Sequence, residues 1–210
     1  MRRAILKEEE LEVKLYVKDL SAVEGRLKST GATPEQERVH EINLRFDTKE
    51  GSLSRSAQVL RLRKDTESRL TYKGPGEMKD GVKARRELEF TVGDFDLARA
   101  FLEALGYQVI LIYEKYRATY MLEGTSVSLD ELPYGNFVEI EGPDSETIHR
   151  VADALGVDWE ARIPDSYTTL FDQLRERLGL PFGDLTFGNF KDLEIRPETL
   201  NVRPADGSSS

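Results

Sequence analysis

The sequence predicts an α+β fold in which eight antiparallel strands close into a barrel, with a charged lumen and helices packed on the outside. The strand-like segments number about eight and follow one another in hairpin order, which is enough to close a barrel. Each segment carries charged residues on one face and apolar residues on the other. The helices predicted between them carry apolar stripes that the outer face of a barrel would bury.

The first half of the chain contains five predicted strands and one helix. Residues 9–17 alternate strictly, with Leu11 and Val13 on one face and Glu12 on the other, which is typical of a strand. A short amphipathic helix over residues 19–29 follows. Gly74-Pro75-Gly76 predicts a turn at the end of the fourth strand. The second to fifth strands cover residues 38–47, 59–63, 69–73 and 83–91.

The second half of the chain begins with a helix predicted over residues 94–105. Residues 107–121 are rich in β-formers and predict either one bent strand or two short ones. After Gly142-Pro143 the pattern becomes helical, and Asp144 or Ser145 and then Asp165 or Ser166 are candidate helix caps. The remaining strands cover residues 125–130 and 136–141, and the last two helices end near residues 155 and 178.

Residues 1–180 form the predicted barrel domain, and residues 181–210 form a predicted C-terminal extension. The apolar periodicity fades beyond Leu180. The last segment, 204–210, has the small and polar composition of a disordered end.

The composition excludes several classes of partner. The formal net charge is −9, so the chain lacks the overall basic footprint of a nucleic-acid-binding or membrane-surface protein. There is no cysteine, and His40 and His149 do not have zinc-site spacing. No apolar signal segment begins the chain, and no window holds the ~18 apolar residues of a membrane helix. We therefore expect a soluble, cytoplasmic protein.

The charged faces of the strands allow two interpretations. Antiparallel sheets more commonly turn such faces toward water. Here the faces mix both signs and combine carboxylate pairs with guanidinium pairs, which favours an inward, hydrated lumen. Carboxylates bind Mg²⁺ or Mn²⁺, and arginine forks and lysines bind phosphate oxygens. The acidic residues are Glu10, Glu12, Glu87, Glu89, Asp130, Glu139 and Glu141, and the basic residues are Lys14, Arg61, Arg63, Lys73, Arg85, Lys115 and Arg117.

The motifs occur in a recognisable order. Glu10-Leu11-Glu12-Val13-Lys14 has the form ExExK. It is followed by Leu60-Arg61-Leu62-Arg63, Thr71-Tyr72-Lys73-Gly74-Pro75, Arg85-Arg86-Glu87-Leu88-Glu89, Glu114-Lys115-Tyr116-Arg117, Leu129-Asp130 and Phe137-Val138-Glu139-Ile140-Glu141. Over residues 8–178 the chain resembles the CYTH domain family, also called the triphosphate tunnel metalloenzymes. Lys73-Gly74-Pro75, Glu114-Lys115-Tyr116-Arg117 and Ser166-Tyr167 resemble the branch that contains bacterial class IV adenylate cyclases.

The resemblance implies an eight-stranded antiparallel tunnel and Mg²⁺- or Mn²⁺-dependent attack on a triphosphate. The metal ligands that it implies are Glu10, Glu12, Glu139 and Glu141, helped by Asp130, Glu87 and Glu89. The residues that it implies for triphosphate binding are Lys14, Arg61, Arg63, Lys73, Arg85, Lys115 and Arg117. By the same resemblance, Glu10, Glu12, Lys14 and Lys73 are the expected catalytic residues.

Two further residues are expected outside this set. Arg45 lies near the barrel in sequence, and we expect it on the surface rather than against a ligand. Tyr167 begins a predicted helix and could reach the tunnel mouth, although packing is the default role for an aromatic side chain there.

The sequence leaves the reaction open. Attack of water on a terminal phosphorus would hydrolyse tripolyphosphate, a nucleoside triphosphate or thiamine triphosphate. Attack of a ribose 3′-hydroxyl on the α-phosphorus of ATP would form cAMP and release pyrophosphate. A non-catalytic module that binds polyphosphate or an organic phosphate is the alternative, although glutamates in the lumen argue against it. A small-molecule triphosphate is the expected partner, and a homodimer is left open.

Overall fold

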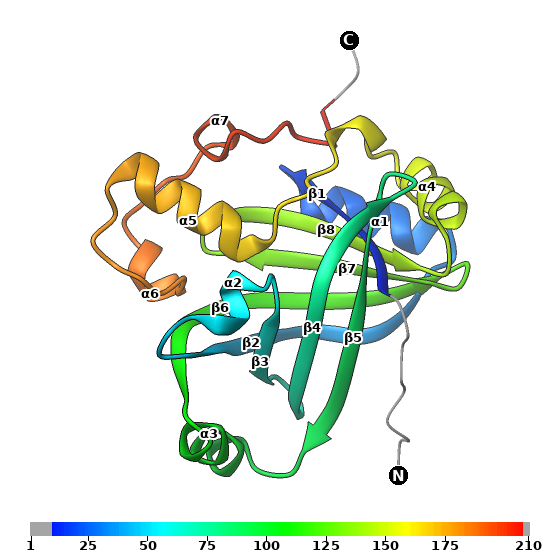
Figure 1. The fold of residues 1–210 in the computed structure, drawn as a ribbon. Helices are drawn as coiled ribbons and strands as arrows, with labels where there is room; N and C mark the ends of the chain where they lie inside the picture. The colour runs from blue at the N-terminus through cyan, green and yellow to red at the C-terminus, as the bar shows by residue number, and fades with distance from the viewer. Residues whose placement is uncertain (1–9, 208–210) are drawn as a thin grey trace.

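The computed structural model describes residues 10–207. Eight antiparallel strands form a closed barrel in the ring order β1-β5-β4-β3-β2-β6-β7-β8 (Figure 1). The predicted fold class is confirmed. The strands are β1 (Glu10–Val17), β2 (Thr33–Thr48), β3 (Val59–Lys64), β4 (Ser68–Lys79), β5 (Val82–Val92), β6 (Tyr107–Leu122), β7 (Thr125–Leu132) and β8 (Gly135–Gly142).

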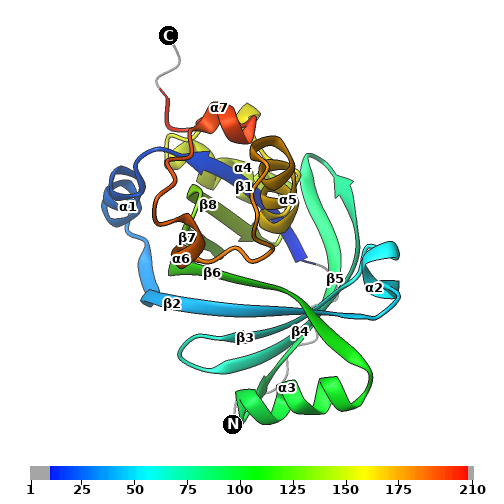
Figure 2. The same ribbon diagram turned by 90° about the vertical axis from the view of Figure 1, so that its left-hand side faces the viewer.

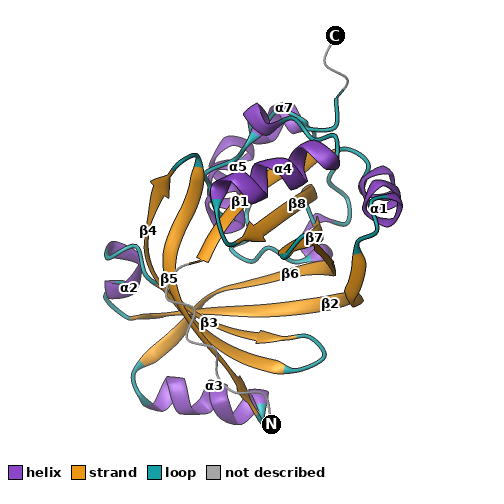
Figure 3. Ribbon diagram, turned by 90° about the vertical axis from the view of Figure 1, so that its right-hand side faces the viewer, coloured by secondary structure: helices purple, strands orange, loops and turns teal. Residues whose placement is uncertain are grey.

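The helices pack on the outside of the barrel (Figure 3). Most of them begin where the side chain of the capping residue accepts a hydrogen bond from a free backbone N–H group, although the short helices 52–55 and 197–200 have no such cap. Asp144 and Ser166 are the caps of the two helices for which alternatives were open. Within residues 10–207, every helix is too short or too polar to cross a lipid bilayer. The helices are α1 (Leu20–Ser29), α2 (Ser52–Arg55), α3 (Phe95–Ala104), α4 (Ser145–Ala154), the 3₁₀ helix η1 (Trp159–Ala161), α5 (Tyr167–Leu178), α6 (Phe187–Phe190) and α7 (Pro197–Leu200).

Two strands differ from the sequence-based expectation. Residues 107–122 form one long strand, which decides between the two alternatives. The turn predicted at Gly74-Pro75-Gly76 is wrong, because β4 continues through these residues to Lys79. The β4–β5 register shifts between Lys73 and Gly76, so a bulge absorbs the proline, which cannot donate a ladder hydrogen bond. The chain turns instead at Asp80-Gly81, where both φ angles are positive.

The apolar faces of the strands point outward to the helices. Val13 of β1 and Ile140 of β8 are buried in one cluster with Val23 of α1 and Ile148 of α4. Leu62 of β3 lies in a second cluster with residues of α3. Because side chains alternate along a strand, the charged residues at intervening positions point into the barrel. The outward apolar and inward charged faces that the sequence predicts are therefore present.

The residues after α5 pack against the barrel (Figure 2). The backbone of Leu185 bonds to Ile112 and Glu114 of β6. The backbone N–H of Ala205 donates to the carbonyl of Tyr16 over 2.8 Å. The segment 204–207, expected to be disordered, therefore lies in an ordered contact with β1. The division of the chain at residue 180 stays a prediction.

Candidate functional site

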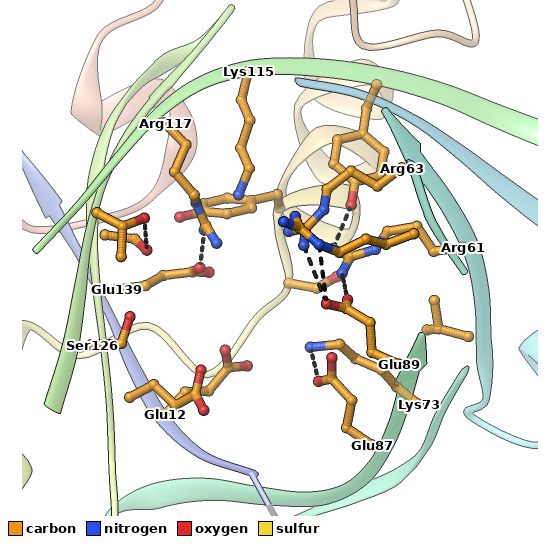
Figure 4. Close-up of a pocket in the computed structure, with 18 of the residues that line it drawn as sticks. Glu12, Arg61, Arg63, Lys73, Glu87, Glu89, Lys115, Arg117, Ser126 and Glu139 are labelled. Carbon is orange, nitrogen blue, oxygen red and sulfur yellow. Dashed lines mark hydrogen bonds and ion pairs between the residues drawn. The ribbon is translucent and has the colours of Figure 1, made fainter. Parts of the chain in front are cut away.

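The barrel encloses a cavity of about 950 Å³ (Figure 4). Its lining contains ten lysine and arginine residues and seven glutamates, so the cavity is locally positive although the whole chain is negative. Twelve of the predicted site residues line it: Glu12, Lys14, Arg61, Arg63, Lys73, Arg85, Glu87, Glu89, Lys115, Arg117, Glu139 and Glu141. The structure therefore brings together residues from six of the eight strands.

Two predicted residues are not among the lining residues. The backbone of Glu10 pairs with Arg85 in the β1–β5 ladder, and its side chain lies outside the described part of the structure. Asp130 is fully buried and does not line the cavity. Its carboxylate accepts hydrogen bonds from Arg117, from Lys115 over 3.1 Å and from the hydroxyl of Tyr167 over 2.7 Å. This placement favours positioning of the two cations over direct metal binding.

Two carboxylates meet on one side of the cavity. Glu12 of β1 and Glu141 of β8 are cross-strand partners, and both line the cavity. The guanidinium of Arg85 lies 3.6 Å from the carboxylate of Glu12. Across the described residues, no three acidic or imidazole side chains converge closely enough to count as a formed metal site. The carboxylate oxygens of the Glu12–Glu141 pair are nevertheless the donor type that Mg²⁺ and Mn²⁺ prefer, so this pair fits such an ion.

The next layer of charges centres on Glu139. Its carboxylate lies 3.2 Å from the ammonium of Lys14 and also pairs with Arg117. Burial alone would raise the pKa of Glu139, but the charges of Lys14, Arg117 and Lys115 hold the pKa well below its ordinary value. Glu139 therefore stays ionised and neutralises cations that a phosphate could otherwise contact.

Arg61, Arg63 and Glu89 lie across the cavity from Glu12 (Figure 4). Glu89 pairs with Arg63 over 3.3 Å and with Arg61 over 3.6 Å. Lys73 and Glu87 form a separate pair over 2.6 Å. Arginine forks suit bidentate binding of phosphate, so Arg61 and Arg63 provide donors opposite the acidic pair.

Glu41 of β2 is a functional candidate that the sequence analysis did not name. It is fully buried, 3.6 Å from Arg63 and 3.7 Å from Lys115. Burial alone would raise the pKa of Glu41, but the surrounding cations lower it from 4.5 to about 2. The alternation of β2 could have identified Glu41, since Glu41, Asn43 and Arg45 share one face of the strand.

Arg45 and Tyr167 also line the cavity, so the surface position expected for Arg45 is wrong. Arg45 donates to the hydroxyl of Thr168 over 2.7 Å, which joins β2 to the start of α5. The ammonium of Lys14 lies 4.4 Å from the centre of the Tyr167 ring, within cation–π range. The sequence left open that Tyr167 reaches the mouth of the barrel, but the partners of Arg45 and Tyr167 depend on where α5 crosses that end.

The fold and the cavity define a class of protein, a closed antiparallel barrel whose inner face carries both carboxylates and clustered cations. The family model for the CYTH domain matches residues 8–165 of the sequence. The chain belongs to the CYTH domain family. Among curated proteins, none matches the sequence significantly.

Solved structures share the fold. A protein from Vibrio parahaemolyticus, described as a candidate adenylate cyclase, is 23% identical with a TM-score of 0.71, and the match covers 79% of this chain and 98% of the other. A protein from Pyrococcus horikoshii is 27% identical with a TM-score of 0.64, over 75% and 96% of the two chains. A Hippeastrum protein named as a candidate adenylyl cyclase with a dominant triphosphatase activity is 21% identical, with a TM-score of 0.54 over 92% and 100%.

Proposed function

We propose that the barrel binds a small-molecule triphosphate together with Mg²⁺ or Mn²⁺ and hydrolyses it. The observation that carries this proposal is that one cavity holds both clustered carboxylates and clustered cations. Carboxylates of β1 and β8 lie on one side, and Arg61 and Arg63 lie on the other (Figure 4). A triphosphate with a divalent cation has both signs of charge and fits such a site.

The basic residues would bind the phosphate oxygens. Arg61, Arg63, Lys73 and Lys115 each pair with a carboxylate of the cavity or its wall. Phosphate oxygens can replace those partners, so the cations need no large movement to bind a substrate. Lys14 and Arg117, which flank Glu139, would neutralise negative charge that develops on the transferred phosphoryl group.

The acidic residues would hold the metal. Glu12 and Glu141 are the proposed ligands on the described side chains, and Glu10 is the predicted third. A divalent ion, when bound, supplies positive charge to phosphate oxygens and polarises the attacking group. Glu139, Glu87 and Glu89 are paired with cations, and we propose that they contribute after substrate has displaced those cations.

Hydrolysis is favoured over cyclisation by the character of the lining. Val59 and Phe90 are the only wholly apolar side chains among the described lining residues, so the cavity is built to recognise phosphate more than a base. In hydrolysis, a water oxygen bonds to the terminal phosphorus while the bridging P–O bond breaks, and the proton of water passes to solvent or phosphate. The dominant triphosphatase activity named for the Hippeastrum relative agrees with this proposal.

The test is a panel of tripolyphosphate, ATP and thiamine triphosphate, each with Mg²⁺ or Mn²⁺ and with the products separated. We expect orthophosphate release that requires the metal. Formation of cyclic AMP with pyrophosphate would show that the reaction is cyclisation and not hydrolysis. Tight binding of all three compounds without any product would instead support the non-catalytic phosphate-binding module.

A further inference from the structure

Helix α3 is apolar on two sides. Its inner side contributes Leu102 and Phe95 to the cluster on the outer face of β3 and β6. Its outer side carries Leu97, Phe101 and Leu105, which are 69%, 63% and 61% exposed. These are the three most exposed large apolar side chains in the described part of the chain. Packing of α3 on the barrel explains the inner side only.

The three exposed residues form one continuous stripe. They are spaced four apart, so they lie on one face of the helix. Ala100 and Ala104 border the stripe, and small residues there let a second helix approach closely. The charges of Arg99 and Glu103 lie away from the stripe and pair with each other over 2.9 Å. The outer face of α3 is therefore apolar and locally uncharged.

The charges around α3 decide which partner fits this face. A helix that lies on a membrane surface carries lysines and arginines on its polar side. The polar residues of α3 and its cap include Asp94, Asp96 and Glu103 against the single cation Arg99, so an anionic lipid surface is a poor partner. The same face on a second copy of the chain is also apolar and uncharged along the stripe, so pairing of the two faces buries no charged side chain there.

We propose that α3 pairs with α3 of a second copy around a two-fold axis near Phe101. In an antiparallel pair centred there, Leu97 faces Leu105 of the partner subunit, and the contact is self-complementary. The stripe offers roughly 300 Å² of apolar surface on each copy, if each of the three large side chains presents about 100 Å². This is less than half of the ~800 Å² per partner in a standard interface, so we expect a weak, reversible dimer.

Sedimentation velocity of the full chain over a concentration series tests the pairing. We expect a monomer–dimer equilibrium that Phe101→Glu shifts to monomer at least tenfold in Kd. Added salt should strengthen the wild-type dimer, because it screens repulsion between two chains of net charge −9. Met78→Glu, at an apolar residue 59% exposed on β4, is the matched control and should leave the equilibrium unchanged. A monomer at every concentration would overturn the proposal.

Crosslinking gives a second test that does not depend on a destabilising charge. The chain contains no cysteine, so a single introduced thiol reports its own position. With a short bismaleimide reagent, Phe101→Cys should give a covalent dimer, whereas Met78→Cys at the same concentration should not. Equal yields from the two variants would show random collision and would refute an interface at α3.

Discussion

Glu12 on β1 and Glu141 on β8 are direct cross-strand partners whose side chains both line the cavity. Directly opposed residues have Cβ atoms about 5 Å apart, and like charges at this separation destabilise a sheet. Arg85 offsets part of this repulsion from 3.6 Å, and a divalent cation between the two carboxylates would offset more of it. This relationship, more than the number of glutamates, places the proposed metal on the β1–β8 side.

Replacing both residues by glutamine tests that placement. In Glu12→Gln with Glu141→Gln, we expect turnover to fall by about 100-fold or more, because metal binding supplies several kcal/mol to such reactions. Without metal, the unfolding free energy of the variant should stay within about 0.5 kcal/mol of the wild type, because the variant loses both the repulsion of the pair and the attraction between Glu12 and Arg85. An assay of phosphate release measures turnover, and thermal unfolding with and without Mn²⁺ measures stability and metal binding, since Mn²⁺ should stabilise the wild type but not the double variant.

Glu123→Gln provides the control for this pair. Glu123 lies in the turn between β6 and β7 and pairs with Arg150 on the exterior over 2.8 Å. Its replacement should change neither turnover nor stabilisation by Mn²⁺. Wild-type activity in the double variant would show that the metal does not bind on the β1–β8 side.

Glu41 is predicted to limit anion binding from behind the cavity wall. Its carboxylate attracts Arg63 and Lys115, which a phosphate would otherwise use in full. In Glu41→Gln, we expect tripolyphosphate to bind about tenfold more tightly and the unliganded protein to lose about 3 kcal/mol of unfolding free energy, because buried cations lose their partner. Calorimetric titration and urea unfolding measure the two changes. Weaker binding would mean that Glu41 orients the cations instead.

The same carboxylate predicts how stability depends on pH. The pKa of Glu41 is lowered from 4.5 to about 2 in the folded state, so the unfolded chain binds protons first as the pH falls. The stabilisation is complete above the unfolded pKa and is lost as the pH falls from about 4.5 toward 2, on the order of 3 kcal/mol for this group. Urea unfolding at pH 6, 4 and 3 should show that the unfolding free energy falls less with pH in Glu41→Gln than in the wild type. An equal fall in the two proteins would contradict the assignment to Glu41.

The strand faces were predictable because alternation is a local property. Once residues 59–63 are a strand, Arg61 and Arg63 must share a face, and the same argument extends to Glu87 with Glu89. The choice between lumen and solvent needed the apolar stripes of the helices, which had to be covered by the opposite face. Glu41 was missed although the same alternation placed it, because no sequence motif drew attention to β2.

Other features could not be predicted because they depend on distant contacts. Asp130 has the parity of a lumen residue, yet Tyr167 from α5 covers it and directs it toward Lys115 and Arg117. The segment after α5 has no periodicity, because it binds through isolated apolar residues. Leu185 and Leu200, for example, are each buried in the apolar cluster that contains residues of α5. The spacing of apolar residues within a segment therefore does not predict where that segment packs against the barrel.

Tyr167→Phe tests whether α5 positions the cations of the site. It removes the buried hydrogen bond to Asp130, 2.7 Å long, and should cost about 1 kcal/mol of stability. We also expect a severalfold rise in KM for the triphosphate, because Lys115 and Arg117 lose part of the network that orients them. Tyr120→Phe removes a comparable bond to Glu24 outside the barrel and should lower stability without changing KM. Identical kinetics in both variants would make Tyr167 a purely structural residue.

Leu185→Ala tests whether the segment after residue 180 belongs to the folded barrel. Leu185 is fully buried, and its backbone bonds to β6 remain when the side chain is shortened. We expect a loss of about 3 kcal/mol in the free energy of unfolding, as for other buried leucines, in a single cooperative transition shared with the barrel. Leu193→Ala, at a residue 39% exposed in the same segment, should cost less than about 1 kcal/mol. If Leu185→Ala cost no more than this control, the segment would be separable from the barrel at the predicted boundary.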